Sequence, residues 1–150
     1  MAVITPPRVE FGHLEPTIVY FDDLDAMGVL HNARYPILVE RSISRYWATR
    51  GYSFENGRPT TPDVFHVVRE FTITYREPIR GTGWVNVHFW LERLGTTGAD
   101  YGFRFLSADC GSVHAEGRRA IVRLDPTTMR PAPWSDKMRA DAVHLLRPQP

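Results

Sequence analysis

Cysteine and long hydrophobic runs are scarce in this sequence, and each scarcity excludes a class of protein. Cys110 is the only cysteine, so no disulfide can form within the chain and a thiolate metal site is disfavoured. No stretch reaches the roughly 18 continuous apolar residues of a membrane helix, and the opening MAVITPPRVEFGH lacks the segments of a signal peptide. These absences favour a cytoplasmic protein with no membrane partner.

The charges indicate no particular partner. The 18 lysine and arginine residues nearly balance the 17 aspartate and glutamate residues, and no block of like sign occurs. A nucleic-acid binder usually carries a basic patch, so that function is disfavoured. The chain has 150 residues, of which 43% are hydrophobic, and this is enough to bury one core. We expect a single domain over residues 1–150.

An amphipathic helix is predicted from Ala33 to about Arg50. Apolar and small side chains recur there at steps of three and four residues, and Gly51 follows as a stop signal. Pro36 has no N–H to donate and fits only the first turn, so regular helix cannot begin much before Asn32. The side chains predicted to be buried are Tyr35, Leu38, Val39, Ser42, Ile43, Tyr46 and Trp47.

Strands are predicted on both sides of this helix. The apolar segment PTIVYFDDL, residues 16–24, precedes it, and alternating segments over roughly 63–78, 83–94, 98–109 and 113–124 follow it. Short glycine-bearing connections, EPIRGTG, RLGTTG and DCGS, indicate antiparallel hairpins between the last four. One strand, one helix and a four-stranded meander predict an α+β fold.

The segment WVNVHFWLE carries bulky side chains on both faces of its strand. One helix covers only one face of a sheet, so we expect the second face to meet another copy of the chain, in a homodimer or homotetramer. The first face holds Val85, Val87, Phe89 and Leu91, and the second holds Trp84, Asn86, His88 and Trp90.

Residues 132–150 are interpreted as a proline-rich tail outside a core of about 15–131. A short helix is expected near 136–146. Ser135 would cap it, because a serine hydroxyl accepts a hydrogen bond from a free N–H at a helix start.

Three acids stand where the first predicted strand ends. Side chains alternate along an extended strand, so Asp23 and Asp25 would share a face while Asp22 points away. A carboxylate beside a like charge and apolar walls is poorly solvated, which makes it a better nucleophile or base than one in water. Asp25 is therefore the candidate catalytic acid. The same pattern also fits acids that only cap the strand in solvent.

The predicted helix start lies seven residues beyond Asp25. The first N–H groups of a helix have no partner inside it and carry partial positive charge. Around His31 and Asn32, such donors can hold a carbonyl oxygen as it becomes an oxyanion, an effect worth roughly 3–4 kcal/mol for a well-placed donor. An acid and an oxyanion hole would then lie one turn apart.

Other kinds of site fit less well. DLDAMGVLHNAR begins like a calcium loop, but Met27 and Arg34 stand at its fifth and twelfth positions, where oxygen ligands belong. The histidines show no helix-spaced pair, which disfavours zinc. No Gly-x-Ser-x-Gly elbow occurs, and no glycine-rich phosphate loop opens a helix. We expect neither a metal nor a cofactor.

The stretch DLDAMGVLHNARYPILVER resembles the signature of hot-dog-fold thioesterases of the 4-hydroxybenzoyl-CoA thioesterase type. Glu40 matches a frequent helix glutamate of that family, and the likeness runs from about Thr17 to Pro131 through ITYREPIRGTG, ERLG and HAEGRRAIVRLDPTTMRP. It implies a hot-dog fold, an antiparallel sheet of about five strands wrapped around one long central helix. The positions that match the signature are Asp23, Asp25, Gly28, Asn32 and Tyr35.

The resemblance also implies hydrolysis of an acyl thioester carried on coenzyme A or on an acyl carrier protein. Asp25 matches the catalytic carboxylate, acting as nucleophile or as general base on water. The backbone at His31 and Asn32 matches the helix end that polarises the thioester carbonyl. Such enzymes place the acyl group between protomers, which agrees with the expected oligomer. The substrate-binding residues implied are Asp23, Gly28, Tyr35 and Glu40.

The turn departs from the family pattern at two positions. Val29 stands where many relatives have histidine, and His31 where they have the first asparagine, so hydrogen bonding around the acyl group differs. Two further functions stay open: a hot-dog protein that binds an acyl carrier or ligand without chemistry, and a hot-dog hydratase or dehydratase. From spacing alone, Glu40 and Arg41 fit a solvated pair on the helix flank, and Trp47 fits either core packing or a pocket for an apolar acyl group.

Overall fold

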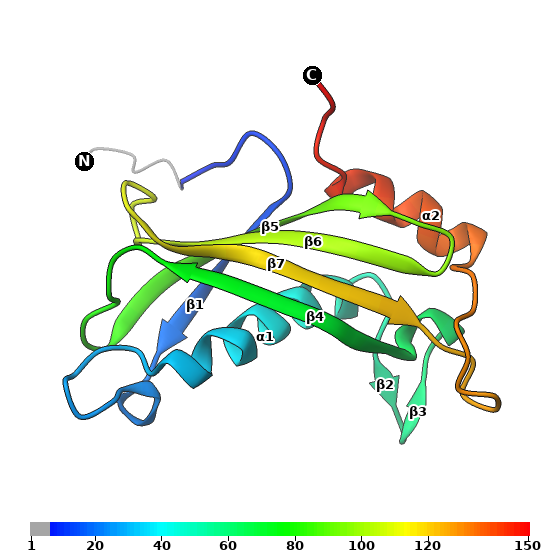
Figure 1. Ribbon diagram of the computed structural model, residues 1–150, viewed down its shortest axis with the longest axis horizontal. Helices are drawn as coiled ribbons and strands as arrows, with labels where there is room; N and C mark the ends of the chain where they lie inside the picture. The colour runs from blue at the N-terminus through cyan, green and yellow to red at the C-terminus, as the bar shows by residue number, and fades with distance from the viewer. Residues whose placement is uncertain (1–6) are drawn as a thin grey trace.

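A five-stranded antiparallel sheet packed on one long helix forms the body of the protein in a computed structural model, which describes residues 7–150 (Figure 1). Neighbouring strands pair in the order β1-β5-β6-β7-β4, and all four pairings are antiparallel. The predicted α+β fold is confirmed. The strands are β1 (His13–Val19), β4 (His66–Tyr75), β5 (Gly83–Leu94), β6 (Gly98–Leu106) and β7 (Val113–Arg123).

The predicted four-stranded meander is wrong at its first connection. β4 pairs with β7 at one edge of the sheet, whereas β5 lies between β1 and β6 on the other side. Residues 76–82 therefore form a crossing loop and not a hairpin, a distinction that loop length alone does not make. Along this loop, the carbonyl of Ile79 accepts the N–H of Leu30 (2.8 Å), and Gly81 donates to the carbonyl of Gly28 (2.9 Å). The loop thus braces the turn that carries the candidate acids.

The central helix α1 (Tyr35–Ala48) follows a short 3-10 turn, η2 (Asn32–Arg34), and Pro36 lies in its first turn as predicted. Gly51, at φ +90°, ends it: its N–H donates to the carbonyl of Ala48, and the N–H of the next residue donates to that of Trp47. All seven side chains predicted to be buried are buried.

The sheet face against α1 carries the core. Val87, Phe89, Phe103 and Phe105 are each 0% exposed, and burying a side chain of this size stabilises a fold by about 1.5–3 kcal/mol. The core extends past the boundary expected at residue 131, because the tail adds further side chains to it. These are Trp134, Met138, Ala142 and Leu145, the middle two on helix α2 (Asp136–Ala142).

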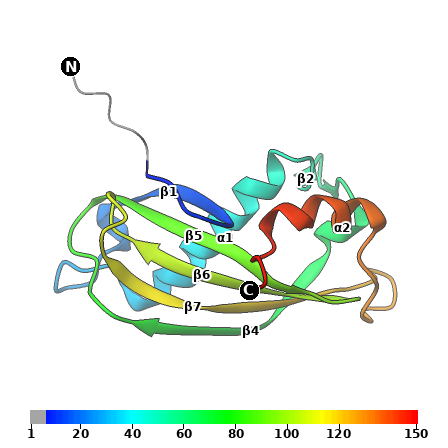
Figure 2. The same ribbon diagram turned by 90° about the horizontal axis from the view of Figure 1, so that it is seen from above.

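Helix α2 confirms the short helix predicted after residue 135. The hydroxyl of Ser135 accepts the N–H of Met138 (3.1 Å), so the predicted cap is present. A 3-10 turn, η4 (Val143–Leu145), follows it. Figure 2 shows α2 at the same end of the molecule as the C-terminal end of α1 and the small hairpin of β2 (Phe54–Glu55) and β3 (Arg58–Pro59).

The second face of β5 is covered largely within the chain, which corrects the argument for an oligomer. Phe11 packs edge-on against Trp90, with ring centroids 5.3 Å apart, and its carbonyl accepts a hydrogen bond from His88 Nε2 (2.8 Å). The guanidinium of Arg147 lies over the Phe11 ring. Of the four side chains on this face only Trp84, at 59%, is exposed. The homo-oligomer stays a prediction.

Candidate active site at the turn before the central helix

The acids lie in a compact turn and not at the end of a strand, which corrects their predicted placement. β1 ends at Val19, and Phe21–Asp23 form a 3-10 turn, η1. Leu24 and Leu30 then pair as an isolated antiparallel bridge, so the chain reverses between them. Gly28 takes φ +75° in this reversal, a conformation that costs a glycine little. Asp23 and Asp25 therefore do not share the face of a strand.

Asp23 fixes the turn to the start of α1. Its side chain is buried, Oδ2 accepts the N–H of Tyr20 (2.8 Å), and Oδ1 lies 3.8 Å from Nε of Arg34. The backbone carbonyl of Asp23 accepts the N–H of His31 (2.9 Å). Because both carboxylate oxygens already face groups of the protein, the contacts of Asp23 are structural. Its role toward a substrate stays a prediction.

Asp25 presents a different arrangement. It is partly exposed, and Oδ1 accepts the N–H groups of Met27 (2.8 Å) and Val29 (3.3 Å). Within residues 7–150, no hydrogen bond reaches Oδ2 and no basic side chain pairs with the carboxylate. One oxygen is thus anchored by the turn while the other can approach a substrate or a water molecule, as a nucleophile or a general base requires.

The helix start offers fewer free donors than the sequence predicts. His31 caps η2: its Nδ1 accepts the N–H of Ala33 (3.0 Å) and its carbonyl accepts that of Arg34 (2.9 Å). The N–H of His31 is also taken, by Asp23. Across the described part of the chain, the N–H of Asn32 has no such partner and Asn32 is exposed. The backbone N–H of Asn32 is therefore the remaining candidate to donate a hydrogen bond to the oxyanion.

Tyr35 and Glu40 lie on α1 and contact the sheet. The Tyr35 ring is buried and packs edge-on against Tyr75 and Phe105, with centroids 5.0 and 4.9 Å away. Burial is the main cause that raises the pKa of its phenol, and electrostatic repulsion from Tyr75 adds to it. Glu40 reaches across to the sheet, where its carboxylate pairs with the buried guanidinium of Arg119 on β7. The interpretation of Glu40 and Arg41 as a solvated pair on the helix flank agrees with their exposure, and the structure adds the contact of Glu40 with Arg119.

The turn thus gathers Asp23, Asp25, Gly28, His31 and Asn32, whereas Tyr35 and Glu40 belong to α1. Sequence reasoning missed Tyr75, whose hydroxyl donates to the carbonyl of Asn32 (3.4 Å) from the end of β4. It also missed Arg119, because its partner lies 79 residues away in the sequence. No short-range pattern signals either contact.

Two cavities lie elsewhere. One of about 430 Å³ runs along the second half of α1, and another of about 210 Å³ lies between α1 and β1. Tyr20 lines the smaller cavity, but Asp23, Asp25, Gly28, His31 and Asn32 line neither of the two. In the described 144 residues from 7 to 150, no cluster of histidine, cysteine or acidic side chains is suited to a metal ion. None of the helices in that part is long and apolar enough to cross a membrane.

Comparison with known sequences supports the predicted resemblance. Residues 19–141 match the profile of the family described as the thioesterase-like superfamily. Proteins named acyl-CoA thioester hydrolase YbgC, from Escherichia coli O157:H7 and from Shigella flexneri, are 28% identical over 116 residues. That alignment covers 77% of this chain and 84% of each relative.

Solved structures show the same fold. The PA5185 protein of Pseudomonas aeruginosa superposes with a TM-score of 0.78 at 20% identity, covering 94% of this chain and 96% of that one. A Thermus thermophilus thioesterase complexed with coenzyme A and zinc superposes with a TM-score of 0.72 at 24% identity, covering 90% and 95%. The predicted hot-dog fold is confirmed by these matches.

Proposed function

The chain belongs to the thioesterase-like superfamily, and from this premise we propose that it hydrolyses acyl-CoA thioesters with Asp25 as the catalytic carboxylate. The observation that carries the proposal is the anchored Asp25, with Oδ1 held by two N–H groups and Oδ2 left for chemistry. Coenzyme A as the carrier is supported by the names of the YbgC relatives and by the coenzyme A bound to the Thermus thermophilus protein. An acyl carrier protein is the second carrier to test.

In the proposed reaction, Asp25 Oδ2 either attacks the thioester carbonyl carbon or takes a proton from a water molecule that attacks it. The oxygen of the carbonyl gains negative charge meanwhile, and the N–H of Asn32 donates to it. The C–S bond then breaks and the thiolate takes up a proton. If water attacked, this step gives the free acid directly; if Asp25 attacked, the acyl group is left on Asp25 as an anhydride, which water hydrolyses to the free acid and the restored carboxylate. One preorganised donor of this kind is worth roughly 3–4 kcal/mol of transition-state stabilisation.

A second copy of the chain would complete this site. β4 is an edge strand of ten residues whose outer side is unpaired in the single chain, and it exposes Val67, Val68 and Tyr75. Long, apolar, unpaired edges are normally covered, because their free N–H and C=O groups pair with any available strand. We therefore propose a homodimer that joins the two sheets through β4, with a tetramer as the alternative.

This pairing would bring together the two ends of β4. In an isologous antiparallel pair, the start of one strand lies beside the end of the other. The end of β4 contacts Asn32 through Tyr75, and its start, His66, lines the 430 Å³ cavity. The turn of one copy would then face the cavity of the other. This arrangement supports a site built from two chains.

The proposal is tested by Asp25→Asn. Asparagine keeps the Oδ1 acceptor for Met27 and Val29, so the turn stays in place while the anionic oxygen is lost. We expect kcat on acyl-CoA thioesters to fall by about 10²–10⁴-fold, the usual contribution of an acid–base residue, with an unchanged melting temperature. Asp22→Asn, an exposed acid in the same turn, is the matched control and should keep full activity.

Two results would contradict this function. Equal turnover by wild type and Asp25→Asn would remove Asp25 from the mechanism. Acyl-CoA or acyl carrier protein retained for hours without hydrolysis would favour a binding protein over an enzyme.

A further inference from the structure

The 430 Å³ cavity is lined by residues of α1 from Glu40 to Ala48 and by residues of α2. Figures 1 and 2 show α2 and the C-terminal end of α1 at the end of the molecule opposite the turn of residues 20–34. The floor of the cavity is the sheet, with Leu91, Tyr101 and Ile121, and its far wall is formed by Trp134 together with Met138 and Ala142 of α2. The near side, along α1, includes the exposed residues Ser44 and Ala48. The cavity is therefore a chamber with one open side.

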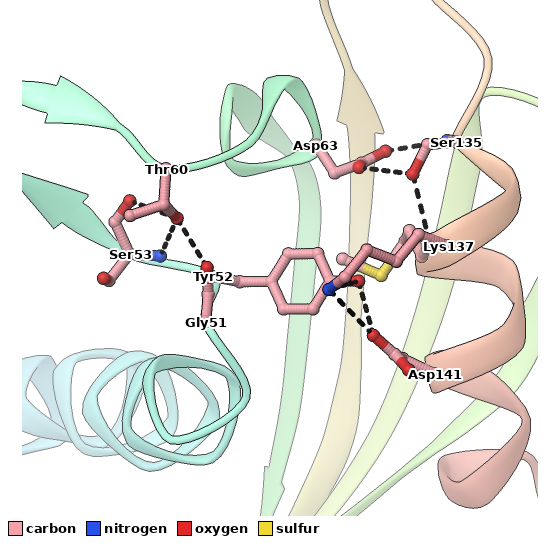
Figure 3. A network of polar contacts seen from close by, with 9 residues as sticks. Gly51, Tyr52, Ser53, Thr60, Asp63, Ser135, Lys137 and Asp141 are labelled. Carbon is pink, nitrogen blue, oxygen red and sulfur yellow. Dashed lines mark hydrogen bonds and ion pairs between the residues drawn. The ribbon is translucent and has the colours of Figure 1, made fainter.

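The α2 wall is tied in place by polar contacts at two points (Figure 3). The hydroxyl of Tyr52, just after α1, donates to Oδ2 of Asp141 (2.6 Å) and accepts from Nζ of Lys137 (3.1 Å). The buried carboxylate of Asp63 accepts both the N–H (2.8 Å) and the hydroxyl (2.6 Å) of Ser135 at the start of α2. These contacts, all between residues of the chain, hold α2 against the segment that follows α1.

The side chains that α2 itself contributes to the chamber, Met138 and Ala142, are apolar, and the polar lining residues include Asp63 beside the start of α2. The hydroxyl oxygen of Tyr101 accepts Nε1–H of Trp47 (2.8 Å), and burial raises the pKa of this phenol to about 12, so the side chain stays neutral. Burial, followed by the charge of Arg119, lowers the pKa of His66, which is neutral at pH 7. The Glu40–Arg119 pair also lines the chamber.

The chamber has room for a sizeable apolar group. A cavity of about 150 Å³ lined by aliphatic and aromatic side chains binds benzene, and ligand pockets usually span about 300–1,000 Å³. At about 430 Å³, this one has room for an aromatic ring and several further carbons. From Glu40 to Ala48, α1 alone gives it a length of about 12 Å at 1.5 Å per residue.

We propose that this chamber holds the acyl group of the thioester and selects apolar acyl groups of medium length or with an aromatic ring, with α2 as the wall that sets their size. The inference rests on the proposed function. The acyl carbons would lie toward α2 and the thioester carbonyl at the end formed by Glu40, Arg119 and His66, which the proposed β4 pairing turns toward Asp25 of the second copy. Acetyl groups would gain nothing from the chamber.

The test is to fill the open side of the chamber. Ala48→Trp adds a large ring at an exposed helix position, so folding should survive, and Thr49→Trp adds the same ring one residue on, at a position that does not line the chamber. Relative to Thr49→Trp, we expect Ala48→Trp to lower kcat/KM for decanoyl-CoA and phenylacetyl-CoA by about tenfold or more, the worth of two buried methylenes. Acetyl-CoA should change by less than about twofold. The same ratio for long and short thioesters in both variants would overturn the proposal.

A second variant tests the α2 wall, and a binding measurement tests the chamber independently of hydrolysis. Ala142→Met fills the chamber from α2 and should shift the preference toward shorter acyl groups; an unchanged profile would count against α2 as the wall. If wild type hydrolyses no thioester, the proposed function fails, and calorimetry with a non-hydrolysable decanyl-CoA thioether still tests the chamber. Binding that Ala48→Trp weakens and Thr49→Trp does not would support it, and no saturable binding by wild type would overturn it.

Discussion

The catalytic turn and the acyl chamber lie at opposite ends of the central helix and are built in different ways. The turn is formed by residues close in the sequence: η1, the reversal at Gly28 and the cap at His31 follow one another within residues 20–34. Most of the hydrogen bonds that stabilise it are donated by backbone N–H groups. The chamber is assembled from side chains of α1, β5, β6, β7 and α2, and partners such as Tyr52 and Asp141 are 89 residues apart. If both proposals hold, short-range rules place the catalytic groups and long-range packing sets the acyl selectivity.

The largest effect on kcat that should depend on the turn alone is expected from a substitution at Gly28. Gly28 and Gly57 have nearly the same φ, +75° and +74°, and a Cβ added at either meets nothing within 4 Å. Alanine at each should therefore cost the same strain, about 1–2 kcal/mol of unfolding free energy by urea titration. Only Gly28→Ala should also lower kcat, by about tenfold or more, because it shifts the backbone beside Asp25 by a fraction of an ångström. Equal kcat in both variants would separate the turn from catalysis.

This contrast also explains what the sequence could predict. The helix, its buried side chains and the capping serine follow from periodicity and capping rules, which act within a few residues, and all were confirmed. The position of β4 was wrong because a seven-residue connection fits a hairpin and a crossing loop equally. The sequence predicted a strand as far as Asp23 because the residues before it are apolar. The 3-10 turn found there is stabilised by a hydrogen bond from the N–H of Tyr20 to the Asp23 carboxylate, which the apolar pattern does not indicate.

The chamber could not be predicted from the sequence, because a cavity depends on contacts between distant residues. Trp47 was weighed as core or pocket, and it serves both, since it is buried against Tyr101 and also lines the cavity. Nothing local distinguishes a packed aromatic side chain from one that borders an empty space. The wall contributed by Met138 and Ala142 depends on where a proline-rich tail folds back, which is set by the ties of Tyr52 and Asp63.

A smaller effect, on stability alone, should appear at His66 in the chamber wall. Its pKa is lowered from 6.5 by burial and by Arg119, so the unfolded chain binds a proton there before the folded chain does. Unfolding free energy should therefore fall as the pH drops below about 6.5, with a slope of at most about 1.4 kcal/mol per pH unit, and level off below the folded pKa. Thermal melts of His66→Gln between pH 7.5 and 5 should show a shallower fall than wild type, while exposed His144→Gln should match wild type. Identical slopes for all three would show that His66 is not the group that titrates.

One experiment tests whether the turn of one chain acts together with the chamber of the other. Chains carrying Asp25→Asn and chains carrying Ala48→Trp, with different affinity tags, are co-expressed and purified as heterodimers. On decanoyl-CoA the Asp25→Asn homodimer should be nearly inactive and the Ala48→Trp homodimer should keep about a tenth of the wild-type kcat/KM or less. A heterodimer has one intact site, with Asp25 from one chain and an open chamber from the other. We predict that it hydrolyses decanoyl-CoA at about half the wild-type rate per dimer, since one of two equivalent sites is restored. Activity no higher than that of the two parents, in a confirmed heterodimer, would contradict a site shared between turn and chamber of different chains.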